Sequence, residues 1–129
     1  MTTKTRLNGC AFSYFQNEVS AIEIQSIATE IYTASKKLAK GIDVLFSLAK
    51  DNAEAEKNYR SALAKEIVKL KLEGQSVTLI NDIARGNQSD LKYLRDVAEF
   101  KYQSGREMLK AIQIQISALQ TVIKYNSEV

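Results

Sequence analysis

The 129-residue chain contains no proline, and its only glycines are at positions 9, 41, 74, 86 and 105. Proline lacks the backbone N–H that a helix needs, and glycine has the poorest helix propensity of the remaining residues. Long stretches of this chain therefore contain nothing that interrupts a helix. Apolar residues make up 45% and charged residues 26%, which is ordinary for a folded protein and argues against disorder. We therefore predict an all-α fold that forms one helical domain over residues 1–129.

The first half of the chain has a helical period that begins near residue 13, after a loose N-terminal arm at 1–12. Apolar residues recur at alternating spacings of three and four, which is the pattern of a heptad seam. The seam consists of Ile24, Ile27, Ile31, Ala34, Leu38, Gly41, Leu45 and Leu48. Ile22, Ala28, Ile42 and Ala49 widen this stripe, so that it suits a helical bundle better than a plain two-stranded coiled coil. We predict a helix over residues 13–50.

A polar interval at 50–57 separates this helix from the next apolar pattern. Asp51 or Asn52 could cap a new helix with Glu54 in its first turn, although no glycine or proline breaks the register. We favour a bend or short loop here, followed by a helix over 53–72, and one unbroken helix is the alternative. The second helix should bury Tyr59, Ala62, Leu63, Ile67 and Leu70, and its Glu56 and Arg60 are spaced to pair on the exposed face.

Residues 73–89 are expected to form a corner that contains a short helix. Gly74 can end the preceding helix with a positive φ, and Ser76 can cap the short helix by accepting a backbone N–H. Gly86 can end the short helix in the same way, and Asn87 or Ser89 can start the next one.

A long helix is predicted over residues 90–125. Its apolar stripe consists of Leu91, Leu94, Ala98, Tyr102, Gly105, Leu109, Ile112, Ile116, Leu119 and Ile123. Lys92 with Asp96, and Arg95 with Glu99, are expected to pair along its outer face. This helix should lie antiparallel to the first one, in an elongated bundle or long-helix hairpin in which Gly41 and Gly105 mark a close crossing. The wide stripes also predict a homo-oligomer.

Several classes of function are disfavoured by residues that the chain lacks. It has no histidine, which removes the commonest general base and metal ligand, and its single cysteine, Cys10, leaves no thiol pair. Glycine-rich phosphate loops are absent as well. We therefore expect no enzyme, no metal site and no cofactor. No apolar run reaches the roughly 18 residues that span a bilayer, and the N-terminus does not resemble a signal peptide, so we expect a cytoplasmic protein without membrane contact.

Charge disfavours nucleic acid as a partner without excluding it. The 18 basic and 15 acidic residues give a net charge of +3 and are mostly interleaved, whereas a nucleic-acid binder concentrates its basic residues. Residues 79–97 have the outline of a helix-turn-helix, but the would-be recognition helix begins with Ser89-Asp90, which places an acid near the phosphates.

The polar residues of the corner are the candidate binding site. Apolar Val77, Leu79, Ile80 and Ile83 can dock the short helix and leave the polar side chains of the same turns facing outward. We predict that a protein partner contacts Gln75, Thr78, Asp82 and Arg85, because arginine suits bidentate pairing with a carboxylate. The alternative is that Asp82 and Arg85 only cap and brace the adjacent helix ends.

Residues 55 to 115 also carry a family resemblance. The runs Tyr59–Leu63, Leu70–Thr78, Asp82–Gly86 and Leu94–Glu99, with Tyr102, resemble a family of small helical phage and prophage proteins from early, recombination-adjacent regions in Gram-positive bacteria. That family has no assigned function, so it supplies no catalytic residues. The resemblance implies a phage-encoded accessory protein that acts in the host cytoplasm. We expect it to bind and modulate or inhibit a host nuclease, defence or replication protein, with a DNA-recombination or nucleic-acid-binding role as the alternative.

Overall fold

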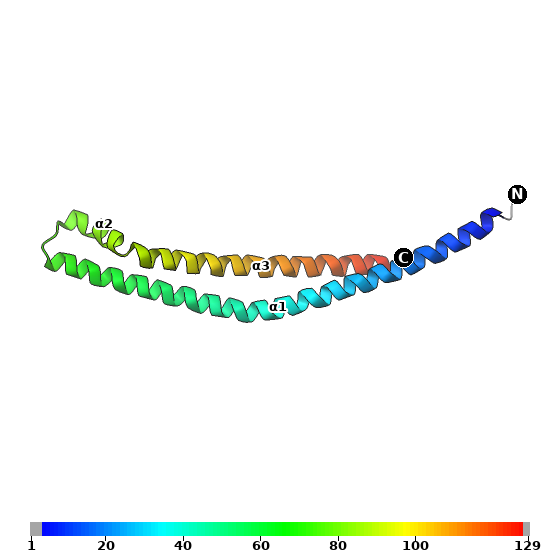
Figure 1. Ribbon diagram of the computed structural model, residues 1–129, viewed down its shortest axis with the longest axis horizontal. Coiled ribbons are helices and arrows are strands. Elements are labelled where there is room, and N and C mark those ends of the chain that lie inside the picture. The colour runs from blue at the N-terminus through cyan, green and yellow to red at the C-terminus, as the bar shows by residue number, and fades with distance from the viewer. Residues whose placement is uncertain (1–3, 128–129) are drawn as a thin grey trace. The chain divides into compact units, whose positions relative to one another are not determined.

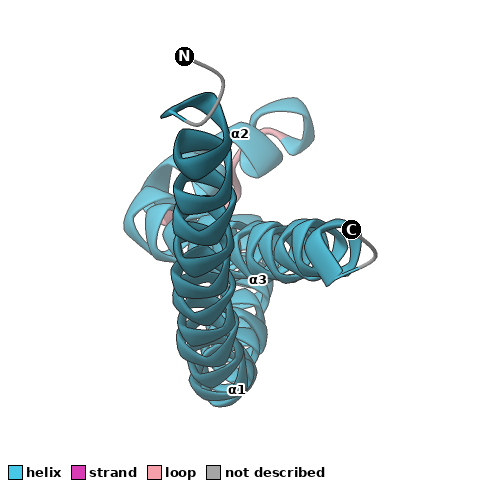
Figure 2. Ribbon diagram, turned by 90° about the vertical axis from the view of Figure 1, so that its right-hand side faces the viewer, coloured by secondary structure: helices cyan, strands magenta, loops and turns pink. Residues whose placement is uncertain are grey.

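Three helices account for nearly all of the chain. The computed structural model describes the backbone of residues 4–127 and the side chains of residues 21–126. Helix α1 spans Lys4–Leu72, α2 spans Val77–Asn87 and α3 spans Ser89–Ser127 (Figure 1). Loop is confined to the short connections on either side of α2 (Figure 2), and the described residues contain no strand. The predicted all-α class is confirmed.

The residues of the chain group into two compact units. One unit consists of Met1–Ala39 with Lys110–Val129, and the other of Lys40–Leu109. In the first unit, Ala34 is buried and the predicted seam residues around it are half-buried. These are Ile24, Ile27, Ile31 and Leu38 of α1, and Ile112, Ile116, Leu119 and Ile123 of α3. The heptad pattern therefore identified the packed side of both helices in this unit.

In the unit Lys40–Leu109, α1 and α3 pack together as an antiparallel hairpin, and leucines of one helix pack closely against two glycines of the other. A Cβ added to Gly41 would collide with the Cδ2 atom of Leu109. A Cβ added to Gly105 would lie 3.3 Å from the Cδ1 atoms of Leu45 and Leu48. The predicted close crossing at Gly41 and Gly105 is therefore confirmed, and leucine side chains of the opposite helix pack against each glycine.

Helix α1 continues through the polar interval where we favoured a break. It runs without interruption to Leu72, so neither Asp51 nor Asn52 acts as a cap. The reason is the unbroken register, since Asn52 is half-buried at a seam position and Ala55 and Tyr59 continue the same inner face. The alternative of a single helix is the correct one.

The N-terminal prediction also needs correction, because α1 begins at Lys4. Most of the expected loose arm is therefore helical. Cys10 lies outside the residues whose side chains are described.

The corner begins with a hydrogen-bonded turn centred on Gly74. This glycine has φ +79, as predicted, and it is the one positive-φ residue in the described chain. Its N–H donates to the Lys71 carbonyl at 3.2 Å, and the Gln75 N–H donates to the Leu70 carbonyl at 3.2 Å. These two bonds form a Schellman motif, which satisfies carbonyls that the end of α1 would otherwise leave unpaired.

Two other predictions about the corner are wrong. Gly86 lies inside α2 with an ordinary helical φ, because α2 continues to Asn87 and only Gln88 separates it from α3. Ser76 is the N-cap residue of α2, but its side chain makes no cap hydrogen bond. Its hydroxyl instead lies 3.0 Å from the Thr78 hydroxyl, and the N–H groups of Leu79 and Ile80 donate to the Ser76 carbonyl.

A small apolar cluster holds α2 against α1. Leu70, Ile80 and Ala84 are buried together, with Leu63, Ile67 and Ile83 packed around them. Val77 and Leu79, which we expected to help dock α2, are 81% and 53% exposed. Asn87 adds a polar contact, since its side-chain amide donates to Glu66 Oε1 of α1 at 2.8 Å. Helix α2 is thus held against α1 by the residues along one side of its surface.

Candidate functional site

The predicted site residues are all exposed, and three of them share one face of α2. Thr78, Asp82 and Arg85 are spaced four and three residues apart, so they lie along one side of the helix, away from the buried Ile80 and Ala84. Gln75 lies in the connection between α1 and α2. The structure therefore presents these four side chains at the surface of the corner, as expected.

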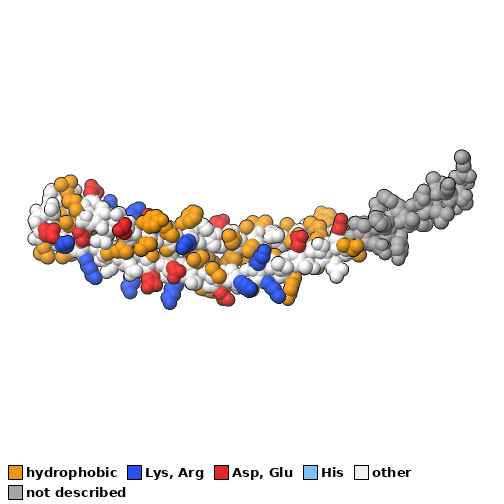
Figure 3. Space-filling model, in the orientation of Figure 1, with side chains coloured by type: hydrophobic (Ala, Val, Ile, Leu, Met, Phe, Trp, Pro, Cys, Tyr) orange, Lys and Arg blue, Asp and Glu red, His pale blue; other side chains and the backbone are white. Residues whose placement is uncertain are grey.

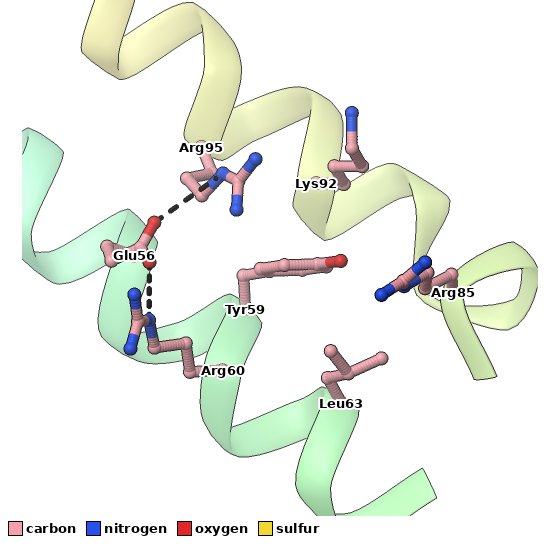
Figure 4. Close-up of a pocket in the computed structure, with 7 residues that line it drawn as sticks. All are labelled: Glu56, Tyr59, Arg60, Leu63, Arg85, Lys92 and Arg95. Carbon is pink, nitrogen blue, oxygen red and sulfur yellow. Dashed lines mark hydrogen bonds and ion pairs between the residues drawn. The ribbon is translucent and has the colours of Figure 1, made fainter. Parts of the chain in front are cut away.

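Arg85 extends from this face into an open pocket, which we call the Tyr59 notch. The notch has a volume of about 500 Å³ and is lined by residues of all three helices. These are Glu56, Tyr59, Arg60 and Leu63 of α1, Arg85 of α2, and Lys92 and Arg95 of α3. Figure 4 shows the Arg85 guanidinium pointing toward Tyr59 and Leu63. Gln75, Thr78 and Asp82 do not line the notch.

The inner wall of the notch is an aromatic ring covered by a cation. Tyr59 is only 5% exposed, and the guanidinium carbon of Arg95 lies 4.7 Å from the centre of its ring. This is cation–π distance, so the ring and the arginine hold each other in place. We had placed Leu94 on the packed side of the last helix and Arg95 outside. The structure reverses them, since Leu94 is 56% exposed and the Arg95 side chain is 24% exposed.

Arg95 forms an ion pair across the two long helices that the sequence did not reveal. Its Nε lies 3.5 Å from Glu56 Oε2, and its Nη2 donates to Asp96 Oδ1 at 2.9 Å. The expected pair of Arg95 with Glu99 is not formed, and Glu99 instead accepts a bond from Gln103 at 3.3 Å. The sequence did contain a signal for the inward position of Arg95. It follows Leu91 by four residues and precedes Ala98 by three, so it lies on the same helix face as these apolar residues.

Two predicted pairs along single helices are confirmed at the border of the notch. Arg60 donates to Glu56 Oε1, and Lys92 Nζ donates to Asp96 Oδ2 at 3.0 Å. The hydrogen bond from Lys92, together with that from Arg95, lowers the pKa of Asp96. The bond to Asp96 in turn raises the pKa of Arg95. Both groups are therefore held in their charged forms.

The notch has an excess of positive charge. Arg60, Arg85, Lys92 and Arg95 contribute four cations, whereas Glu56 is the one carboxylate among the lining residues. Arg60, Lys92 and Arg95 are neutralised in part by Glu56 and by Asp96 beside the notch. Arg85 has no ion-pair partner among the described side chains. A notch of this composition can bind an anion, with Arg85 as the free donor.

Metal chemistry has no candidate ligand set in the described part of the chain. Within it, no group of three or more histidine, cysteine, aspartate and glutamate side chains is placed to hold a metal ion. The described helices also contain no segment that is long and apolar enough to cross a membrane.

Comparisons of the chain with protein-family models, with curated proteins and with solved structures find no match.

Proposed function

We propose that this chain is a non-enzymatic, phage-type accessory protein that binds a host protein and modulates or inhibits it. The observation that carries the proposal is the Tyr59 notch, into which Arg85 extends without an ion-pair partner among the described side chains. Its side chains are suited to holding a charged group and include no imidazole or thiol that could act as a base or nucleophile. Binding is thus the chemistry that the site supports.

An acidic side chain of the partner is the group that fits the notch. An arginine fork pairs bidentately with a carboxylate, and the neighbouring cations add to the attraction. Tyr59 and Leu63 supply apolar contact for the stem of an incoming aspartate or glutamate. Thr78 and Asp82 on the outer face of α2, with Gln75 beside it, would then form the polar rim of the same interface.

Binding to a nucleic acid is the second candidate, and the four cations of the notch are the observation that favours it. Proteins that bind a phosphate backbone usually repeat such cations along the strand. Here the cations form one cluster that two carboxylates, Glu56 and Asp96, already neutralise in part. A protein carboxylate therefore suits the notch better than a polyphosphate chain does.

The experiment is affinity capture from lysate of a Gram-positive host, followed by affinity measurements with the purified partner. Arg85→Ala should weaken binding by about tenfold, equivalent to about 1.4 kcal/mol, which is the size of loss expected when an arginine that anchors an interface is truncated. The melting temperature should stay nearly unchanged, since Arg85 makes no described ion pair. Arg106→Ala is the matched control, because Arg106 is an exposed arginine that stacks on Tyr102 outside the notch.

Two outcomes would contradict the proposal. If Arg85→Ala binds the partner as the wild type does, the notch is not the binding site. If stability falls in step with affinity, Arg85 braces the helix ends, as the structural alternative holds. Salt-dependent binding of DNA oligonucleotides, lost in Arg85→Ala, would support the second candidate instead.

A further inference from the structure

Helix α1 carries an uncharged strip on the side of the helix pair that also bears the notch. It consists of Ile42, Phe46, Ala49 and Ala53, spaced four, three and four residues apart, so the four side chains form one stripe. Phe46 is 72% exposed and Ile42 is 46% exposed. The next residue in this phase is Glu56, where the notch begins. We call these four residues the Phe46 strip.

A pocket lies within the Phe46 strip. It has a volume of about 150 Å³ and is lined by Ile42, Leu45, Phe46 and Ala49 with Tyr102 of α3. All five lining residues are apolar or aromatic, so the pocket suits an apolar side chain. Each copy of the chain therefore carries a protruding phenylalanine and an apolar recess side by side.

The order of large and small residues makes the strip self-complementary. Ile42 and Phe46 are large and come first, and Ala49 and Ala53 are small and come last. If two copies meet antiparallel about a two-fold axis, Phe46 of each copy faces Ala49 of the other, and Ile42 faces Ala53. An isologous interface requires this arrangement, in which the same patch serves both partners. Polar residues border the strip, including Glu99 near Ala49 and Arg106 over Tyr102.

The unit that carries the strip leaves large apolar side chains uncovered. Only five apolar side chains are buried among the described residues, and Phe46, Tyr93 and Phe100 are 72%, 67% and 72% exposed. An interface between two copies would cover part of this apolar surface. Figure 3 shows hydrophobic side chains exposed among the charged ones on one face.

We propose that two copies of the chain associate antiparallel through the Phe46 strip and so form a four-helix arrangement. A second copy is the occupant because the strip is uncharged and because its large residues, Ile42 and Phe46, would face the small residues, Ala53 and Ala49, of the other copy across a two-fold axis. The notch begins at Glu56, beyond the last residue of the strip. The proposal does not depend on what the notch binds.

The first test is the mass of the purified full chain, measured by sedimentation equilibrium between about 1 and 100 μM. The wild type should have twice the monomer mass of 14.4 kDa at the upper concentrations. Phe46→Glu should weaken the dimer by at least tenfold, since it places a carboxylate against apolar surface. Val44→Glu is the matched control, because Val44 is 57% exposed on the same helix but lies outside the strip, and it should leave the mass unchanged. Circular dichroism should show equal helix content in all three.

The second test examines which residues face each other. Ala49→Lys alone should also weaken the dimer, because it places the lysine against Phe46 of the second copy. Mixing Phe46→Glu with Ala49→Lys should restore a dimer, since one contact becomes a carboxylate–ammonium pair and the other is native. A mixture that stays monomeric would overturn the antiparallel register. Two results would overturn the proposal that a second copy covers the strip: a wild type that is monomeric at 100 μM, or a Val44→Glu chain whose dimer is weakened as much as that of Phe46→Glu. A different protein would then be the partner that covers the strip.

Discussion

Replacing Gly41 by alanine should destabilise the wild-type chain, yet stabilise a chain in which Leu109 is alanine. Two opposing effects determine the sign. Alanine in a helix interior is favoured over glycine by about 1 kcal/mol. Against this, a Cβ at position 41 would collide with Cδ2 of Leu109, and inserting an extra methyl group into a packed interface costs about 1 to 3 kcal/mol. The net change in the wild type is a loss of up to about 2 kcal/mol.

Removing the Leu109 side chain removes the collision and keeps the helix-propensity gain. In the Leu109→Ala background, Gly41→Ala should therefore raise the free energy of unfolding by about 1 kcal/mol. The coupling energy between the two positions equals the collision, about 1 to 3 kcal/mol, as a double-mutant cycle would report it. Four chains complete the cycle, and urea denaturation followed by circular dichroism at one protein concentration measures each free energy.

Gly86→Ala is the matched control for this cycle. Gly86 also lies in a helix, and a Cβ there would meet nothing within 4 Å. Alanine at 86 should therefore stabilise the chain by about 1 kcal/mol in either background. If Gly41→Ala were stabilising by the same amount with Leu109 present, the close approach of α1 and α3 at this level would be refuted.

Three further outcomes follow from the corner and from the pair beside the notch. Gly74→Ala should lower the free energy of unfolding by about 1 kcal/mol or more in urea melts, because φ +79 is strained for alanine, and a neutral result would contradict the turn. Ser76→Ala should change the free energy of unfolding by less than about 0.5 kcal/mol, since its side chain makes no cap hydrogen bond. A loss above about 1 kcal/mol would show that the Ser76 side chain does cap α2. The pKa of Asp96 is lowered in the fold, so its stabilisation is complete above the unfolded aspartate pKa near 3.8 and is lost as pH falls through the lower folded value. Melting temperatures between pH 6 and pH 2 should therefore fall less for Asp96→Asn than for the wild type, and parallel curves would contradict the pairing.

The sequence alone determined the helical class and most of the residues on the packed side of each long helix. Helical periodicity is a local property, so the recurrence of Ile24 to Leu48 was sufficient to identify the residues that face inward. Gly74 was equally readable, because a glycine directly after an apolar helical stripe is the usual C′ residue of a Schellman turn. The candidate face of α2 followed from the same spacing argument, and the structure does place Thr78, Asp82 and Arg85 at the surface.

Tertiary packing decided the features for which local energies were nearly equal. Residues 50–53 could cap a new helix or continue the old one, and the seam shared by Asn52, Ala55 and Tyr59 favoured continuation. Gly86 could end a helix or lie within one, and the following turn placed it within α2. Leu94 and Arg95 both fit a helical stripe, three and four residues after Leu91. Only the contact with Glu56 and Tyr59 on the opposite helix turned the arginine inward.

The Tyr59 notch itself could not be found from the sequence. Its lining residues come from three helices and span positions 56 to 95, and each of them has an ordinary solvent-exposed or core role when considered along its own helix. Periodicity assigns a residue to a face of its own helix, but it carries no information about which residue of another helix lies opposite. That alignment depends on the register between α1 and α3, which is set by the fit of Leu109 at Gly41 and of Leu45 and Leu48 at Gly105. The sequence thus determined the faces, and side-chain packing between the helices determined the site.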